Sequence, residues 1–168
     1  MITHTFTRAN GKVVSGEEVI KIIADYVKQE PKAQYEFTVG TDSQAHGDKT
    51  KIAEVIAIRR VGHGGIYFSY IEYVDIISNL RKKIIEETHR SINNADGLLE
   101  GVQLILIDEG IDIDKLDIRF QIHCDIGKDG RTSEFIKDIV NWVQGLHYEC
   151  LIKPRSYTAS GVADKFSK

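Results

Sequence analysis

Cysteine is scarce in this sequence. Only Cys124 and Cys150 occur among 168 residues, and neither belongs to a Cys-x-x-Cys pair or stands near paired histidines. This spacing argues against a zinc site and against a disulfide framework, so both are predicted to be small buried side chains. The sequence also lacks a long apolar run: the N-terminal "MITHTFTRANGK" is polar, and no stretch approaches the ~18 apolar residues of a membrane span. We therefore expect no membrane partner and a cytoplasmic location.

Charge of one sign is not in large excess. The sequence has 22 Lys and Arg against 25 Asp and Glu, a net charge of −3. This balance argues against a protein that coats nucleic acid by bulk electrostatics, but it allows a local basic surface beside an acidic pocket. A hydrophobic content of 42% and a charged content of 28% are ordinary for a globular protein. The length predicts a single domain over residues 1–168.

Apolar periodicity switches between that of helices and that of strands along the chain. Ser15 and Glu18 form a capping-box pattern for a helix that Pro31 ends, so residues 1–33 are predicted to be an extra N-terminal helical segment. Strands are predicted for residues 35–41, 51–60, 66–74, 116–124 and 147–154, and helices for 78–107, 128–146 and 158–168. Gly97 is a candidate break in the long helix, and Thr132 or Ser133 is the candidate cap of the next one.

This element order predicts an α/β fold. The first three strands are joined by short, glycine-bearing connections and are expected to form an antiparallel meander. The later strands alternate with helices, which calls for parallel pairing. The expected architecture is a mixed five-stranded sheet, with three antiparallel strands followed by parallel ones, and with helices on both faces.

Acidic residues are predicted at the ends of two strands. Asp42 follows "EFTVGT" and Asp125 follows "FQIHC". If the two strands are parallel neighbours, both carboxylates meet at one end of the sheet, where α/β proteins bind ligands. For Asp42 alone, a turn-forming role is the ordinary alternative.

The long helix offers a third acid. At 100° per residue, Glu87 lies at the edge of the apolar stripe, whereas Glu86 points nearly opposite and is predicted to be solvated. Asp164, on the final predicted helix, can supply a fourth acid, although its chemistry alone does not single it out. Crowded carboxylates raise one another's pKa unless a cation neutralises them. Mg²⁺ and Mn²⁺ prefer oxygen ligands, and a pair of such ions can activate water for phosphodiester hydrolysis.

Four segments in this order resemble the YkuK family, which is grouped with the ribonuclease H-like superfamily. They are "VGTDSQ", "EET", "HCDIGKDGRTSEFIKDIV" and "IKPRSYTASGVADKFSK", and the similarity extends from about Ser15 to the C-terminus. The resemblance implies the ribonuclease H fold and a divalent-metal nuclease site that uses Mg²⁺ or Mn²⁺. It implies that Asp42, Glu87, Asp125 and Asp164 occupy the acidic positions on the first strand, the helix, the fourth strand and the last helix.

Basic residues cluster in the segments expected near these acids. Lys128, Arg131, Lys153 and Arg155 are candidate contacts to a nucleic-acid backbone, and solvated surface charge is the alternative for each. The segment "GKDGRTS" is too short for a phosphate-binding loop of the GxxxxGK[ST] type, but it can still contact a backbone phosphate.

His46 and His123 are candidate proton shuttles or, alternatively, hydrogen-bonded structural groups. Ser43 is not part of a GxSxG elbow, which argues against acyl transfer. Three functions stay open. The first is a metal-dependent nuclease acting on nucleic acid, and the second is a ribonuclease H-like binding module without turnover. The third is an ATP-binding protein of the same fold, which ranks last because this chain is too short for the usual second half-domain.

Overall fold

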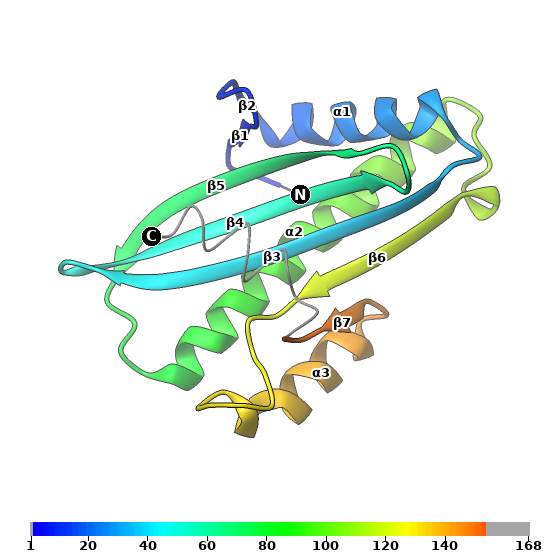
Figure 1. Ribbon diagram of the computed structural model, residues 1–168. Coiled ribbons are helices and arrows are strands. Elements are labelled where there is room, and N and C mark those ends of the chain that lie inside the picture. Colours follow the sequence, from blue (N-terminus) through cyan, green and yellow to red (C-terminus); the bar gives the residue numbers. More distant parts are fainter. Residues whose placement is uncertain (1, 154–168) are drawn as a thin grey trace.

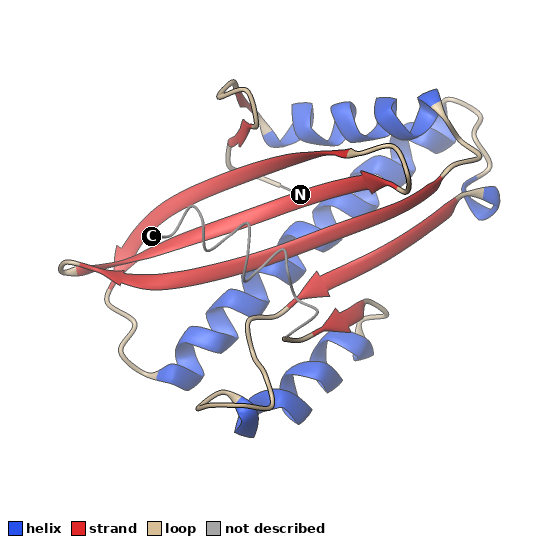
Figure 2. Ribbon diagram, viewed as in Figure 1, coloured by secondary structure: helices blue, strands red, loops and turns tan. Residues whose placement is uncertain are grey.

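The computed structural model describes residues 2–153, and within them the chain forms one seven-stranded sheet with three α-helices (Figure 1). Helices, strands and loops are distinguished in Figure 2. The strands are β1 (Phe6–Arg8), β2 (Val13–Val14), β3 (Gln34–His46), β4 (Lys49–Arg60), β5 (Gly65–Asp75), β6 (Asp117–His123) and β7 (Glu149–Leu151). The helices are α1 (Gly16–Gln29), α2 (Leu80–Asp108) and α3 (Ile136–Gly145), with short 3₁₀ helices at Ile113–Lys115 and Ser133–Phe135.

The sheet is mixed, in the order β2-β1-β5-β4-β3-β6-β7. Strands β3, β4 and β5 form the predicted antiparallel meander, and β6 adds parallel to β3, followed by β7 parallel to β6. The predicted count of five strands is wrong for the described residues, because β1 and β2 extend the sheet beyond β5. These two strands have three and two residues, too few for alternation to be recognised in the sequence.

Strand β3 is longer than predicted, and Asp42 does not end it. The strand continues through "TDSQAH" to His46, because each of these residues pairs with β4, including Asp42 with Ala53. The reversal comes at Gly47 and Asp48, where Gly47 adopts a φ of 62° that a side chain would strain. The polar residues at 41–44 therefore belong to a hairpin and not to a turn after a strand.

Helices α1 and α2 follow their sequence signals closely. The Ser15 hydroxyl accepts a hydrogen bond from the Glu18 amide, and the Glu18 carboxylate accepts one from the Ser15 amide, which confirms the capping box. Helix α2 runs unbroken through the buried Gly97, so the candidate break is not used. None of the helices in residues 2–153 is both long and apolar enough to cross a membrane.

The core lies between one face of the sheet and the helices. Tyr35, Phe37 and Val39 of β3 point to this face and are almost fully buried against apolar residues of α1, α2 and α3. In Figure 1, α2 crosses behind the strands, and α1 lies above β5 beside one end of α2. Within residues 2–153 the helices gather on this face, so the prediction of helices on both faces is not met there. The predicted final helix, residues 158–168, lies outside the described residues.

The start of α3 differs from the prediction. A 3₁₀ turn at Ser133–Phe135 precedes the helix, and Thr132 makes no capping hydrogen bond with its side chain. The Thr132 hydroxyl instead accepts a hydrogen bond from the Gly127 amide at 3.1 Å, and Ser133 donates one to the Gly130 carbonyl. Both hydroxyls are thus used to fold the loop that follows Asp125.

Candidate functional site

The candidate site is built where α2 passes beneath the middle of β3. Side chains of β3 alternate between the two faces, so Thr41 and Ser43 point toward α2 and Asp42 points to the other face. The Thr41 and Ser91 hydroxyls are 2.8 Å apart. The Ser43 amide and hydroxyl both donate to one oxygen of Glu87, Oε2, at 2.8 and 2.7 Å. These bonds fix the strand against the helix at the position of the acids.

Glu87 is a buried carboxyl group, with only 8% of its surface exposed. Burial raises the pKa of Glu87 to about 8, the Ser43 hydrogen bonds oppose this rise, and the nearby charges of Asp42 and Asp125 add to it. At neutral pH, Glu87 therefore carries a proton when no cation is close. The prediction that Glu87 faces inward agrees with the structure, while Glu86 is partly exposed and pairs with Arg90.

Asp125 lies two residues beyond the end of β6 and is held in place by β7 and the residues after it. The Cys124 amide donates to the Leu151 carbonyl at 2.9 Å, and the Lys153 amide donates to the Ile126 carbonyl at 2.8 Å. The Lys153 Nζ is then 2.8 Å from Asp125 Oδ1. This hydrogen bond raises the pKa of Lys153, and the charges of Asp42 and Glu87 raise it further. The Lys153 ammonium therefore lies in the electric field of the Asp125 and Asp42 carboxylates, and also in that of Glu87 once Glu87 ionises.

Asp42, on strand β3, is the third acid of the candidate site. It is 3% exposed and lies two residues beyond the last β3–β6 pair, which joins Gly40 to His123. Its charge acts on both Glu87 and Lys153. The three acids are thus neighbours, yet within residues 2–153 no three Asp, Glu, His or Cys side chains converge closely enough to hold a metal ion.

The other predicted site residues fall into two groups. Lys128 and Arg131 are exposed in the loop that follows Asp125. Asp164 and Arg155 lie outside the described residues, so the fourth acid and one basic contact stay predictions.

The two histidines have different surroundings. His123 is 1% exposed, and burial lowers its pKa to about 4, so the ring is neutral at physiological pH. This burial favours a structural role. His46 is exposed at the β3–β4 turn, where its ring lies 5.3 Å from that of Tyr73. It is four residues beyond Asp42, or about 13 Å along a strand, which is too far for a proton relay to that carboxylate.

Sequence reasoning missed Glu54, a second buried acid. Glu54 is 1% exposed on β4, where its Oε1 accepts from Asn94 Nδ2 at 2.6 Å and its Oε2 from Arg90 Nη1 at 2.9 Å. His4 Nε2 is 3.3 Å from the same Oε1. The signal was present, because Glu54 alternates with Ile52 and Ile56 on the core-facing side of the strand. The network ties β4 and the N-terminus to α2.

The parallel β3–β6 pair, the helix across it and the three acids at its end define a ribonuclease H-like arrangement. The model of the family described as "Ribonuclease H-like" matches residues 18–168. The chain is also 32% identical over 155 residues, 90% of each chain, to a protein of Bacillus subtilis (strain 168) that is named "Uncharacterized protein YkuK". The chain therefore belongs to the YkuK family of the ribonuclease H-like superfamily. No solved structure matches it significantly.

Proposed function

We propose that this protein is a divalent-metal-dependent nuclease that hydrolyses phosphodiester bonds of nucleic acid. Asp42, Glu87, Asp125 and Asp164 would hold Mg²⁺ or Mn²⁺. When bound, such ions supply an activated water and stabilise the leaving oxygen. Membership of the ribonuclease H-like superfamily supports a role in nuclease chemistry or nucleic-acid binding.

One observation carries the proposal: a buried carboxyl group has two further carboxylates within its electrostatic reach. The pKa of Glu87, raised to about 8 by burial and by Asp42 and Asp125, means that the group is poorly compensated as an anion. Carboxylates arranged in this way are unfavourable for folding alone, and they are typical of functional sites.

The donor chemistry of the site fits a hard cation, since every candidate ligand is a carboxylate oxygen. The partners of Glu87 and Asp125 in the described structure bear on ion binding. Glu87 accepts from Ser43, and Asp125 pairs with Lys153. Binding of an ion by this set requires that both carboxylates exchange these partners, and it releases the proton of Glu87.

Basic residues near the acids support a nucleic-acid substrate. Lys153 lies beside Asp125, and Lys128 and Arg131 are exposed in the adjoining loop. Cationic side chains at these places would contact backbone phosphates and position the strand. Arg155 is proposed for the same role from its sequence position.

Cleavage of a substrate panel tests this function. Labelled single-stranded, duplex, hybrid and branched nucleic acids are incubated with the protein and Mn²⁺ or with EDTA. We expect cleavage that needs Mn²⁺ and that is abolished by Asp42→Asn and by Asp125→Asn. Asp108→Asn, an exposed change at the far end of α2, is the matched control and should cleave like the wild type. Full metal-dependent turnover by either site variant would overturn the assignment.

A binding module without turnover is the second candidate. The observation that favours it is that Lys153 already neutralises Asp125, while no three potential ligands within residues 2–153 converge on one point. Calorimetric titration separates the two functions. Binding of Mg²⁺ or Mn²⁺ at millimolar concentration or below supports the nuclease, and its absence, together with retained nucleic-acid binding, supports the module.

A further inference from the structure

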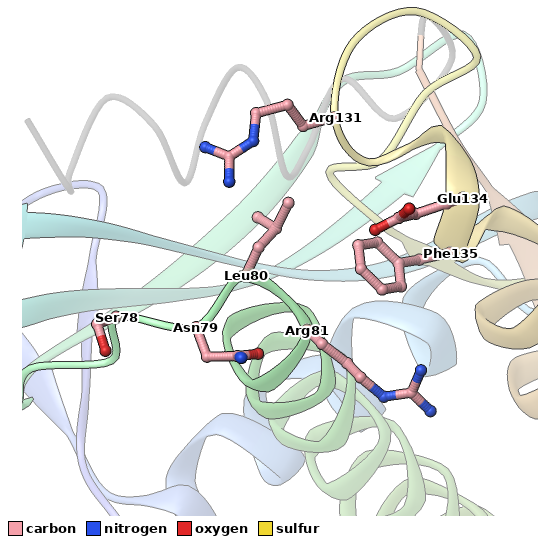
Figure 3. Close-up of a pocket in the computed structure, with 7 residues that line it drawn as sticks. All are labelled: Ser78, Asn79, Leu80, Arg81, Arg131, Glu134 and Phe135. Atoms are coloured by element: carbon pink, nitrogen blue, oxygen red, sulfur yellow. The ribbon is translucent and has the colours of Figure 1, made fainter.

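A cleft near the acidic site is not accounted for by metal binding. Its volume is about 670 Å³, within the range of small-molecule sites. It opens between the first turn of α2 and the loop that leads into α3 (Figure 3). Its lining residues are Ser78, Asn79, Leu80, Arg81, Arg131, Glu134 and Phe135.

Two arginines of this cleft have no acidic partner among the described residues. Arg81 and Arg131 are exposed, and neither forms an ion pair with another residue of the 2–153 segment. In contrast, Arg90 and Arg119 are each paired with glutamate. Toward the rest of the 2–153 segment, the guanidinium groups at the cleft therefore keep their hydrogen-bond donors available, and a planar fork of donors suits phosphate.

An aromatic ring lies between these two charges. Figure 3 shows Leu80 and Phe135 facing the cleft together, with Arg131 on one side of the Phe135 ring and Arg81 on the other. Phe135 is only partly buried, so part of its ring borders the cleft. An apolar surface flanked by phosphate-binding groups has the composition of a base-stacking platform.

Both walls of the cleft are connected along the chain to the acids. Leu80 precedes Glu87 by seven residues on α2, about 10 Å along the helix axis. On the other wall, the loop that carries Arg131 starts at Asp125 and is closed by the hydrogen bond from the Gly127 amide to Thr132. A strand that passes through the cleft would thus continue toward the carboxylates.

We propose that this cleft binds unpaired nucleotides of a nucleic-acid strand, with a base stacked on Phe135 and phosphates contacted by Arg81 and Arg131. The protein then prefers single strands or strand ends over continuous duplex, because a base can stack on Phe135 only when it is not enclosed in a duplex. This inference rests on the proposed function, in that the ligand of the acidic site is nucleic acid.

Binding in EDTA tests the cleft without cleavage. Fluorescence anisotropy is measured with a labelled single-stranded oligonucleotide, a blunt duplex of the same sequence, and a single strand whose central positions lack bases. The wild type should bind the ordinary single strand more tightly than the duplex and the abasic strand. Phe135→Ala should weaken binding of the ordinary strand about fivefold or more and leave binding of the abasic strand unchanged.

The salt dependence of oligonucleotide binding tests whether Arg81 and Arg131 contact phosphates. Arg131→Ala and Arg81→Ala should each reduce the slope of log Kd against log salt by about 0.7, the value for one phosphate contact on a single strand. Lys115→Ala, at the opposite end of β6, removes the same charge and should leave the slope unchanged. Glu134→Gln removes the carboxylate that lines the cleft and should tighten binding.

Two further variants separate stacking from folding. Phe135→Tyr keeps a flat ring and should bind normally, whereas Phe135→Leu keeps the apolar contacts without the ring and should bind like Phe135→Ala. Equal affinity for single strand, duplex and abasic strand would overturn the inference, as would wild-type binding by both Phe135→Ala and Phe135→Leu. An acidic peptide as the true ligand would show arginine dependence without Phe135 dependence, and this result also overturns it.

Binding and cleavage measured together distinguish a failure of the cleft inference from a failure of the proposed nuclease activity. If the cleft variants bind as the wild type does while Mn²⁺-dependent cleavage is observed, the cleft inference alone is wrong. If binding depends on Phe135 and Arg131 but no cleavage occurs with any substrate, the nuclease assignment is wrong and the cleft inference stands.

Discussion

The Lys153 ammonium lies 2.8 Å from Asp125 Oδ1, at a place where the charges of Asp42 and Glu87 also act on it. The Lys153 ammonium thus neutralises part of the negative charge that would otherwise attract a metal ion. Lys153 comes from the residues after β7, so its position depends on the parallel pairing of β7 with β6.

Removal of the Lys153 charge should increase the affinity of the three acids for a metal ion. Lys153→Met leaves Asp125 without its ammonium partner and increases the negative potential at the three acids. Because the Lys153 side chain is 49% exposed and Asp125 is 22% exposed, we expect a modest effect, with Mn²⁺ binding tightened about two- to fivefold. Titration calorimetry measures it, with Lys115→Met as the control of equal charge. Weaker Mn²⁺ binding by Lys153→Met would contradict this view and would favour a role of Lys153 in ordering the site.

Because of Glu87, the free energy of unfolding should decrease as the pH rises. Its pKa is about 8 in the folded protein against an ordinary value near 4.5, so the folded state holds the proton more tightly than the unfolded state. The free energy of unfolding should therefore fall as pH rises from about 4.5 to 8, by several kcal/mol at most, since one pKa unit corresponds to about 1.4 kcal/mol.

Urea denaturation at pH 6 and pH 9 checks this dependence. Glu87→Gln cannot ionise and should lose less stability than the wild type between these two values. Glu86→Gln, on the exposed side of α2, is the neighbouring control and should keep the wild-type dependence. A wild-type protein whose stability is constant over this range, or higher at pH 9, would show that Glu87 is better compensated than its burial indicates.

The buried Glu54 network should be a major contribution to stability. Arg90 bonds Glu54 and Glu72 through Nη1 and Glu86 through Nε, so Arg90→Met leaves the buried Glu54 carboxylate without its permanently charged partner. We expect a loss of about 3–5 kcal/mol in the free energy of unfolding, as for other broken buried pairs. Glu86→Gln removes only the exposed bond and should cost about 0.5 kcal/mol or less. If Arg90→Met and Glu86→Gln lower the free energy of unfolding by similar amounts in urea denaturation, the buried Arg90–Glu54 bond is not the main contribution.

The two cysteines should differ in reactivity although their sulfurs are 3.9 Å apart. A hydrogen bond with Cys150 and burial raise the pKa of Cys124, while the same hydrogen bond lowers the pKa of Cys150. Cys150 is also the more exposed of the two. Iodoacetamide should therefore modify Cys150 severalfold faster than Cys124, as measured by peptide mass mapping of the native protein. Faster labelling of Cys124 would show that the strand end opens readily.

The sequence was most informative where one periodicity governs one element. The angular position of Glu87 relative to Leu80 and Ile84 predicted its inward orientation, and the capping box predicted the start of α1. The end of β3 was predicted wrongly, because polar residues at 41–44 are typical of turns and their pairing with β4 is a long-range property. The cleft at Phe135 was not predicted, since its two walls are separated by about fifty residues and meet only through the packing of α2 beside the loop after β6.

The order of the strands also determines when these acids can repel one another. Between Asp42 and Asp125 the chain forms the rest of the meander and a 29-residue helix, and the pairing of β6 with β3 then brings the two acids together. In partly folded chains the carboxylates are far apart and solvated, and their mutual repulsion is small. The repulsion between Asp42 and Asp125 therefore arises only once β6 has aligned with β3, so we expect the docking of β6 to depend on ionic strength.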